Sequence, residues 1–364
     1  MSNWSLMNVS LSVPDADIGS EWQGLVSRSL AASGHTAPEL LLPAIKHHRR
    51  AILGAVRDGE GLQLALPLIS RRFPFRFHAS LSTPVNFYGL PHLDRYQAVP
   101  AMMAMLRHLD EPLLLRALPM DSPVWDVVAG SATHVKILHQ WDRAVLRPKG
   151  TYAHWFETNF KPRRRKEYRR LQARLAEQGM LEALTFHRGD DAGRWAREFL
   201  DLEAKGWKGR RGTAFKSDPV VAATLMECLG GLAAAGKLRF WKLALDGKPI
   251  AMLFAIVEGN EAWLGKIAHD EDLAGFSPGV QLILHATEQL FAEGIVTADS
   301  CADPDHPMIN RLWRGRLRVA DVMLAADSVN HMTFTITAAS ERLRHRARAV
   351  AKVIYYRLIG GQRR

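Results

Sequence analysis

Three strand-like segments in succession, followed at once by an amphipathic helix, constrain the fold of this chain more than any other feature. The segments span residues 238–245, 250–257 and 262–268. Asp246 and Gly247 separate the first two, and an Asp-Gly pair between apolar segments is typical of a tight β-hairpin. A second turn, Gly259 and Asn260, leads into the third segment. The sequence therefore predicts an antiparallel meander.

The helix expected after Pro278 has an apolar face suited to packing on this sheet, formed by Val280, Ile283, Leu284, Thr287, Leu290 and Phe291. Ser277 suits the N-cap, Pro278 the first helical position, and Gly279 leaves the backbone accessible. The amides of Gly279, Val280 and Gln281 are then expected to be free to bind an anion, helped by the helix dipole. We predict a diphosphate site here; an ordinary capped helix is the alternative.

A meander followed by such a helix start makes the sequence resemble the GNAT acyltransferases. AHDED at 268–272 and FSPGVQL at 276–282 resemble the strand, loop and helix that hold the acetyl-CoA diphosphate in that family, although the usual loop contains more glycine. The pattern is similar to the divergent bacterial (CelD-like) subgroup associated with exopolysaccharide and cellulose biosynthesis. EAKGWKG at 203–209 and Asp299 add to the resemblance. The subgroup is itself similar to the Fem-type aminoacyltransferases, which use tandem GNAT-like domains.

The resemblance implies an α/β (α+β) fold with two tandem GNAT-like units, each a mixed, mostly antiparallel sheet flanked by helices. A second hairpin pattern supports a duplication, because Asp58 and Gly59 also separate two apolar segments. The expected domains are a degenerate N-terminal unit (1–150), an acetyltransferase unit (151–337) and a basic amphipathic tail (338–364). The last strands of the second sheet are expected near 318–325 and 331–337. The Ser-Pro-Gly sequence occurs only in the second unit, so the cofactor site is assigned there.

In the GNAT mechanism that the resemblance implies, the acceptor attacks the thioester of acetyl-CoA directly. Backbone amides around Leu264, Gly265 and Lys266 would polarise the carbonyl where neighbouring strands part. The expected diphosphate contacts are Phe276, Ser277, Pro278, Gly279, Val280 and Gln281. Acetyl-CoA is the expected co-substrate, and no metal is expected.

Three carboxylates are candidates for the base that takes the acceptor's proton. Asp299 is preferred because it ends a short strand beside the cofactor helix; its alternative role is to bind the backbone of Ser300 or Ala302 in a turn. Glu203, near the end of a helix, is the second candidate, and its alternative role is that of a solvated helix residue. Asp270 is the third, with a loop role as its alternative.

Aromatic and cationic residues after that helix suit a carbohydrate acceptor. Trp207 can stack on a sugar ring, while Lys208 and Arg211 can bind a phosphate or uronate. The alternative is that Trp207 packs against its own helix.

The formal net charge of +11 indicates an anionic partner. Basic residues concentrate at 161–170, in an expected helix of residues 163–179, and in the tail Arg342–Arg364, whose mixed apolar and basic composition suits an anionic membrane surface. The sequence contains no apolar segment of membrane-spanning length and no signal-peptide pattern, so a cytoplasmic location, peripheral at the inner membrane face, is expected. Two cysteines, Cys228 and Cys301, are too few for a disulfide framework.

The preferred interpretation is an acetyl-CoA-dependent acetyltransferase acting on a sugar amine, or a hydroxyl, of a cell-envelope polysaccharide or its precursor. Nucleic acid is not a partner in this interpretation. Two alternatives remain open. One is a Fem-like transferase that uses aminoacyl-tRNA, and the other is a non-catalytic peripheral membrane adaptor with a GNAT shell.

Overall fold

The computed structural model describes residues 7–72 and 74–360. In this part of the chain, thirteen strands form one mixed sheet with the order β1-β2-β3-β4-β6-β13-β7-β12-β11-β10-β9-β8, and β5 pairs with β3. The strands are β1 (Asn8–Ser12), β2 (Ala51–Asp58), β3 (Gly61–Arg71), β4 (Phe77–Ser80), β5 (His92–Leu93), β6 (Leu113–Pro119), β7 (His134–Leu146), β8 (Leu181–Thr185), β9 (Leu238–Leu245), β10 (Lys248–Glu258), β11 (Glu261–His269), β12 (Thr297–Asp299) and β13 (Gly315–Ala325). The expected α/β class is confirmed.

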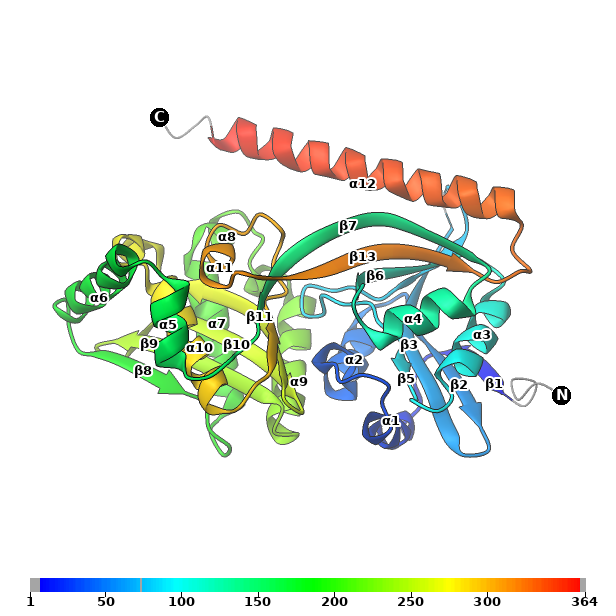
Figure 1. Ribbon diagram of the computed structural model, residues 1–364, viewed down its shortest axis with the longest axis horizontal. Helices are drawn as coiled ribbons and strands as arrows, with labels where there is room; N and C mark the ends of the chain where they lie inside the picture. Colours follow the sequence, from blue (N-terminus) through cyan, green and yellow to red (C-terminus); the bar gives the residue numbers. More distant parts are fainter. Residues whose placement is uncertain (1–6, 73, 361–364) are drawn as a thin grey trace.

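Helices flank both halves of this sheet (Figure 1). They are α1 (Ile18–Ser27), α2 (Pro38–His47), α3 (Ala98–Leu109), α4 (Pro123–Ser131), α5 (Tyr152–Asn159), α6 (Pro162–Ala176), α7 (Ala192–Lys205), α8 (Trp207–Arg210), α9 (Pro219–Ala234), α10 (Pro278–Ala292), α11 (Ile309–Leu312) and α12 (His331–Gly360). Short 3₁₀ turns are η2 (Gly34–Thr36), η3 (Phe215–Ser217) and η4 (Glu271–Phe276). The basic helix expected at 163–179 is confirmed as α6, which buries Leu171 and Leu175.

The predicted meander is confirmed as β9, β10 and β11, joined by antiparallel pairing. Asp246 and Gly247 form the first turn with φ angles of 50° and 73°. Two successive residues at positive φ match the right-handed twist of a hairpin, and Asp-Gly adopts them readily. The Asp-Gly pair therefore determines where the first strand ends.

The two halves repeat one topology. In the N-terminal half, β2, β3 and β4 form antiparallel pairs, and β4 then pairs in parallel with β6. In the C-terminal half, β9, β10 and β11 are followed by the parallel pair of β11 and β12. A helix precedes the parallel partner in each half, α3 before β6 and α10 before β12. The predicted repeat of the hairpin thus extends to the whole unit.

Two predictions about the last elements are wrong. The strand β13 does not complete the second sheet, because it pairs with β6 and β7 of the N-terminal half. Residues 331–337 are not a strand but the start of α12. The strand β7 also pairs with β12, so it joins the two halves into one sheet. Figure 1 shows β7 and β13 as a long arch between them.

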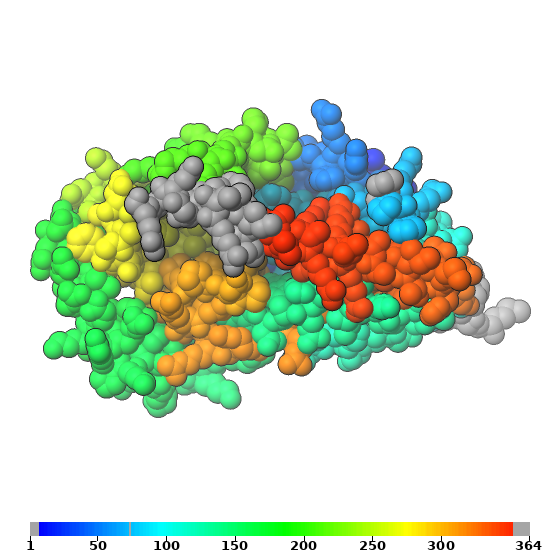
Figure 2. Space-filling model, turned by 90° about the horizontal axis from the view of Figure 1, so that it is seen from above, coloured from blue at the N-terminus to red at the C-terminus, as the bar shows by residue number. Residues whose placement is uncertain are grey.

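The helix α12 begins at His331 and continues past residue 338, so the predicted tail is part of a longer helix. Phe334 and Ala338 pack against Phe77 and Met323. Seen from above, residues 331–351 of α12 lie along the surface of the N-terminal half (Figure 2). No described helix is long and apolar enough to cross a membrane. Residues 1–6 at the N-terminus, and Arg363 and Arg364 of the predicted basic tail, lie outside the described residues.

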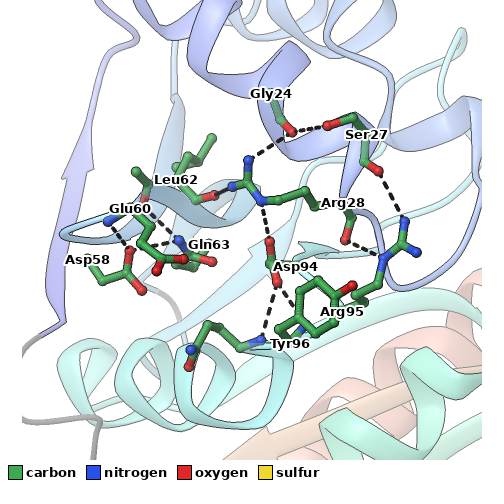
Figure 3. A network of polar contacts seen from close by, with 12 residues as sticks. Gly24, Ser27, Arg28, Asp58, Glu60, Leu62, Gln63, Asp94, Arg95 and Tyr96 are labelled. Atoms are coloured by element: carbon green, nitrogen blue, oxygen red, sulfur yellow. Dashed lines mark hydrogen bonds and ion pairs between the residues drawn. The ribbon is translucent and has the colours of Figure 1, made fainter.

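A polar network fixes the segment that follows α1 (Figure 3). Arg28 donates from Nε to Asp94 Oδ2 at 2.6 Å and from Nη2 to the carbonyl of Leu62 at 3.1 Å. The other oxygen of Asp94 accepts from the amide of Tyr96 at 2.8 Å. The network links the end of α1 to β3 and to the start of α3. It therefore holds in place the segment after α1, which leads to the junction between the halves.

Candidate active site

The strands β11 and β12 part in the middle of the sheet. They pair in parallel from Glu261 and Thr297 to Trp263 and Asp299. Strand β12 ends at Asp299, whereas β11 continues to His269. An opening therefore begins directly after Trp263, at the place where the sequence predicted that neighbouring strands part.

A β-bulge lies on β11 at this opening. Ala255 pairs with Leu264, but Leu253 pairs with Ile267, so β11 contains one more residue than β10 over this interval. Gly265 is required there, because a Cβ atom on it would lie 2.0 Å from the ring of Phe254. A bulge disrupts the ladder and leaves a residue unpaired. Of the three residues predicted to present amides to a thioester, Gly265 and Lys266 form the bulge and Leu264 is the last paired residue before it.

A cavity of about 410 Å³ occupies the opening. Leu264, Gly265, Lys266 and Ile267 line it from β11, and residues 300–303 line it from the chain after β12. Ile283 of α10 and Phe215 of η3 also contribute. Because α10 and η3 pack against opposite faces of the sheet, as the separate core clusters around Ile283 and Phe215 show, the cavity is accessible to groups from both faces.

The N-terminus of α10 differs in detail from the prediction. Ser277 is at the N-cap, but its φ of 53° is left-handed and its side chain makes no capping bond. Its carbonyl accepts the amides of Val280 and Gln281 at 3.0 and 3.2 Å, so the prediction that these two are free is wrong. In the part of the chain that the structure describes, the Gly279 amide has no acceptor. The guanidinium of Arg174, on α6, lies 5.6 Å from the ring centre of Phe276 in the adjacent loop.

Glu203 is buried beside the cavity. Its Oε1 lies 2.5 Å from Nζ of Lys266 and 3.5 Å from Nζ of Lys208, and its Oε2 accepts the amide of Phe215 at 2.8 Å. Both lysines line the cavity. Burial, together with the charge of Lys208, lowers the pKa of Lys266 to about 8, although Glu203 acts in the opposite direction. A fraction of this amine is therefore neutral near pH 7.

Asp299 lies in a different buried cluster between the halves. Its Oδ2 accepts the hydroxyl of Tyr88 and lies 3.7 Å from Nη1 of Arg143, and its Oδ1 accepts the amide of Cys301 at 2.8 Å. The last of these contacts is a turn contact of the kind expected as the alternative role, but the amide belongs to Cys301 and not to Ser300 or Ala302. Burial raises the pKa of Tyr88, and the carboxylate of Asp299 raises it further, so the phenol stays protonated as the donor.

The third candidate carboxylate holds loops together. Asp270 Oδ2 lies 2.6 Å from Nζ of Lys205, and its Oδ1 accepts the amide of Asp272. Beside it, Trp207 is 38% exposed and its ring lies 5.0 Å from the guanidinium carbon of Arg211. Of the three predicted acceptor-binding residues, Lys208 lines the cavity.

The N-terminal half contributes a segment that fills its own equivalent opening. After β4, the chain returns so that the Gly89 amide donates to the carbonyl of Arg116 on β6 at 2.9 Å. The fit is close, since a Cβ on Gly89 would lie 1.8 Å from Oγ of Ser80. Pro84 and Phe87 of the same segment line the 410 Å³ cavity. One loop thus occupies the first opening and forms a wall of the second.

Several residues at the site had no signal in the sequence. Nε2 of His35 lies 3.4 Å from Sγ of Cys301, and burial lowers the pKa of His35 to about 3. His306 lines the cavity, and burial lowers its pKa as well. His35 and Tyr88 belong to the N-terminal half, and neither their spacing nor their neighbours indicate that they contact residues after β12.

A second cavity, of about 250 Å³, lies at the junction of the halves and is lined by Tyr88, His92, Glu261, Trp263 and Asp299. Its lining includes neither the bulged residues Gly265 and Lys266 nor any residue of α10. Among the described residues, no group of three or more His, Cys, Asp or Glu side chains is placed to hold a metal ion. We therefore take the opening between β11 and β12 as the candidate active site.

Comparison with known proteins shows what one segment and the fold of the chain are similar to. Residues 162–306 match the family described as acetyltransferase (GNAT) domain. No curated protein matches the chain. Solved structures share its fold at low identity. FemX has a TM-score of 0.55 and 10% identity, and the match covers 84% of this chain and 95% of that chain. L-PGS from Bacillus licheniformis has a TM-score of 0.54 and 8% identity, and the match covers 90% of this chain and 97% of that chain.

A third structure is the C-terminal domain (DUF2156) of a putative lysylphosphatidylglycerol synthetase from Agrobacterium fabrum. It has a TM-score of 0.57 and 12% identity, and covers 89% of this chain and 96% of that chain. At such identities the likeness concerns the fold alone. Residues 162–306 thus resemble a GNAT acetyltransferase domain, and the fold of the whole chain is similar to that of FemX.

Proposed function

We propose that this protein is an acetyl-CoA-dependent acetyltransferase that binds its donor in the opening between β11 and β12. The observation that carries the proposal is that the bulge lines the cavity and that the α10 N-terminus lies beside its wall: a Cβ on Gly279 would lie 3.3 Å from Met308 and 3.6 Å from Ile267, which both line it. An acyl thioester needs donors at the carbonyl oxygen, where charge develops during attack. The bulged residues Gly265 and Lys266, with Leu264 beside them, would supply backbone amides for that purpose.

The diphosphate of the donor would lie at the loop before α10. The Gly279 amide lacks an acceptor there, and the helix N-terminus attracts an anion. Arg174, which stacks over Phe276, adds a cation from α6. This arrangement gives α6 a second role beside packing, because Arg174 would lie near the donor's charged end.

The acceptor would approach from the side of α7, α8 and the N-terminal loop. Lys208 lines the cavity there, with Trp207 and Arg211 next to it, and Phe87 forms the opposite wall. An aromatic ring beside cations suits a sugar that carries phosphate or uronate. We propose an amine, or a hydroxyl, of a cell-envelope polysaccharide or its precursor as the acceptor group. The basic part of α12 would place the enzyme at an anionic membrane surface.

Glu203 is the carboxylate that we propose as the proton acceptor. It contacts two cationic side chains of the cavity wall, whereas Asp299 and Asp270 are engaged in ion pairs away from that wall. Asp299 would act by holding Cys301 and the chain after β12 in position. Asp270 would hold α7 against the diphosphate loop through Lys205.

Filling the cavity tests the donor site. Ala302 is partly buried and lines the cavity, so Ala302→Phe should weaken acetyl-CoA binding by at least about tenfold in calorimetry. Ala235→Phe is the matched control, because Ala235 is exposed at the end of α9. Unaltered affinity in a folded Ala302→Phe protein would exclude this cavity as the donor site.

A Fem-like transferase using aminoacyl-tRNA is the second candidate. The observation that favours it is the basic helix α6, whose Arg163, Arg164, Lys166, Arg169 and Arg170 are exposed. Cations on one helix suit phosphate contacts, whose binding weakens steeply with salt. A salt-sensitive tRNA complex, together with no calorimetric signal from acetyl-CoA or CoA, would favour this candidate over the first.

A further inference from the structure

Lys266 is a residue whose side chain the direct-transfer mechanism does not use. It belongs to the bulge, so the backbone amide proposed to polarise the thioester and the side-chain amine come from one residue. The amine lines the cavity, and its Nζ lies 3.2 Å from the ring centre of Phe215. Glu203 Oε1 lies 2.5 Å from it on the other side. An amine and a proton acceptor are therefore already in contact inside the candidate donor site.

We propose that Lys266 is an internal acyl acceptor, which takes an acyl group from the thioester bound in this cavity. The inference rests on the proposed function, because it requires a donor between β11 and β12. It adds a covalent modification site to the cavity wall, with an acyl thioester as the modifying reagent.

The chemistry balances with groups already in the site. The neutral amine of Lys266 attacks the thioester carbonyl, a C–N bond forms and the C–S bond breaks. The proton released by the amine passes to the Glu203 carboxylate and from there to the departing CoA thiolate. The products are an amide on Lys266 and free CoA, and no oxidant or further reactant is needed. Reactivity needs the neutral amine, and a pKa of about 8 leaves a usable fraction of it at neutral pH.

Acylation would change the site in two ways. It removes the positive charge that lies beside Glu203, leaving Lys208 as the remaining cation of that cluster. It also places the acyl group in the cavity that the donor must enter. The modified protein should therefore bind acetyl-CoA more weakly, so that excess donor limits its own use.

The test uses the full-length protein incubated with acetyl-CoA alone, followed by intact mass and peptide mapping. We expect one acetyl group on Lys266, added about ten times faster at pH 9 than at pH 7 because the neutral fraction follows a pKa of about 8. Lys266→Arg should abolish this label. Lys208→Arg, which changes another lysine of the same cavity, should keep it.

Calorimetry with acetyl-CoA on the same protein separates the two possible failures. Binding without acetylation of Lys266 overturns this inference and leaves the proposed function intact. Absence of binding overturns the proposed function, and this inference with it. Equal labelling of Lys266, Lys208 and an exposed lysine such as Lys216 also overturns it, because the cavity then confers no selectivity.

Discussion

Gly265 demonstrates how a single residue shapes the candidate site. The ring of Phe254 occupies the space that a side chain at Gly265 would need. Because Gly265 has no side chain, β11 can bulge over the neighbouring strand. The bulge in turn presents Lys266 to Glu203. A glycine in a strand was visible in the sequence, and such glycines often mark bulges or close approaches. The aromatic ring that requires it is on another strand, and only the pairing register identifies it.

Two buried histidines make stability depend on pH. Burial lowers the pKa of His35 to about 3 and that of His92 to about 4, against about 6.5 in an unfolded chain. At pH values between the folded-state and the unfolded-state pKa, the unfolded chain binds more protons than the folded protein. The stability that the neutral histidines contribute is therefore fully present above pH 6.5 and is lost as pH falls toward 4. Each histidine contributes a slope of up to about 1.4 kcal/mol per pH unit.

We predict that the free energy of unfolding depends less steeply on pH when one of the two buried histidines is replaced. Urea unfolding at pH 7 and pH 5 should show a stability loss that is about 2 kcal/mol smaller in His35→Gln than in the unaltered protein. The comparison of the two slopes excludes the effect of the substitution itself, which is present at both pH values. An identical slope in the two proteins would mean that the pKa of His35 is the same in the folded and unfolded states.

At the scale of elements, α12 is anchored to the sheet by its first turns. Phe334 is 4% exposed and packs with Ala338 against the core of the N-terminal half. Arg342 donates to the carbonyl of Ile137 on β7, and His345 lies with its ring centre 4.1 Å from that of His139. The basic composition of residues 338–364 suggested an interfacial helix, but it held no information on these contacts.

Removing the anchor should destabilise the protein rather than only release the helix. Phe334→Ala is expected to reduce the free energy of unfolding by about 3–5 kcal/mol, because it leaves a cavity between α12 and β13. Ile336→Ala is the matched control, with a side chain that is 43% exposed and an expected loss below about 1 kcal/mol. Equal losses in urea titrations of the two variants would contradict this packing.

At the scale of the whole molecule, strand exchange makes the halves interdependent. The strand β13, near the C-terminal end, lies between β6 and β7 of the N-terminal half. The strand β7 lies next to β12, which carries Asp299. A cut at residue 150 therefore separates β12 and β13 from the strands with which they pair. The boundary at residue 150 is a proposal for where the two units of the duplication meet.

Separate halves should not fold alone. A fragment of residues 151–364 keeps β12 and β13 but loses β6 and β7, so unpaired strand edges are exposed in the middle of its sheet. We expect the fragments 1–150 and 151–364 to lack a cooperative urea transition and dispersed amide NMR signals. Cooperative unfolding of residues 151–364 alone would show that the exchanged strands are not required for folding.

Local elements were predictable from the amino-acid sequence: the β9–β11 meander, the helix α10 after Pro278, the basic helix α6 and the repeated hairpin. These follow from side-chain periodicity and turn chemistry, which act between residues close in the chain. The folded structure was needed to show which strands β13 joins, where β11 bulges, and that Tyr88 and Asp299 share a hydrogen bond. Such contacts depend on the register and packing of segments that are far apart in the sequence. The local pattern therefore predicted a place for the donor, and the long-range contacts assembled the site around it.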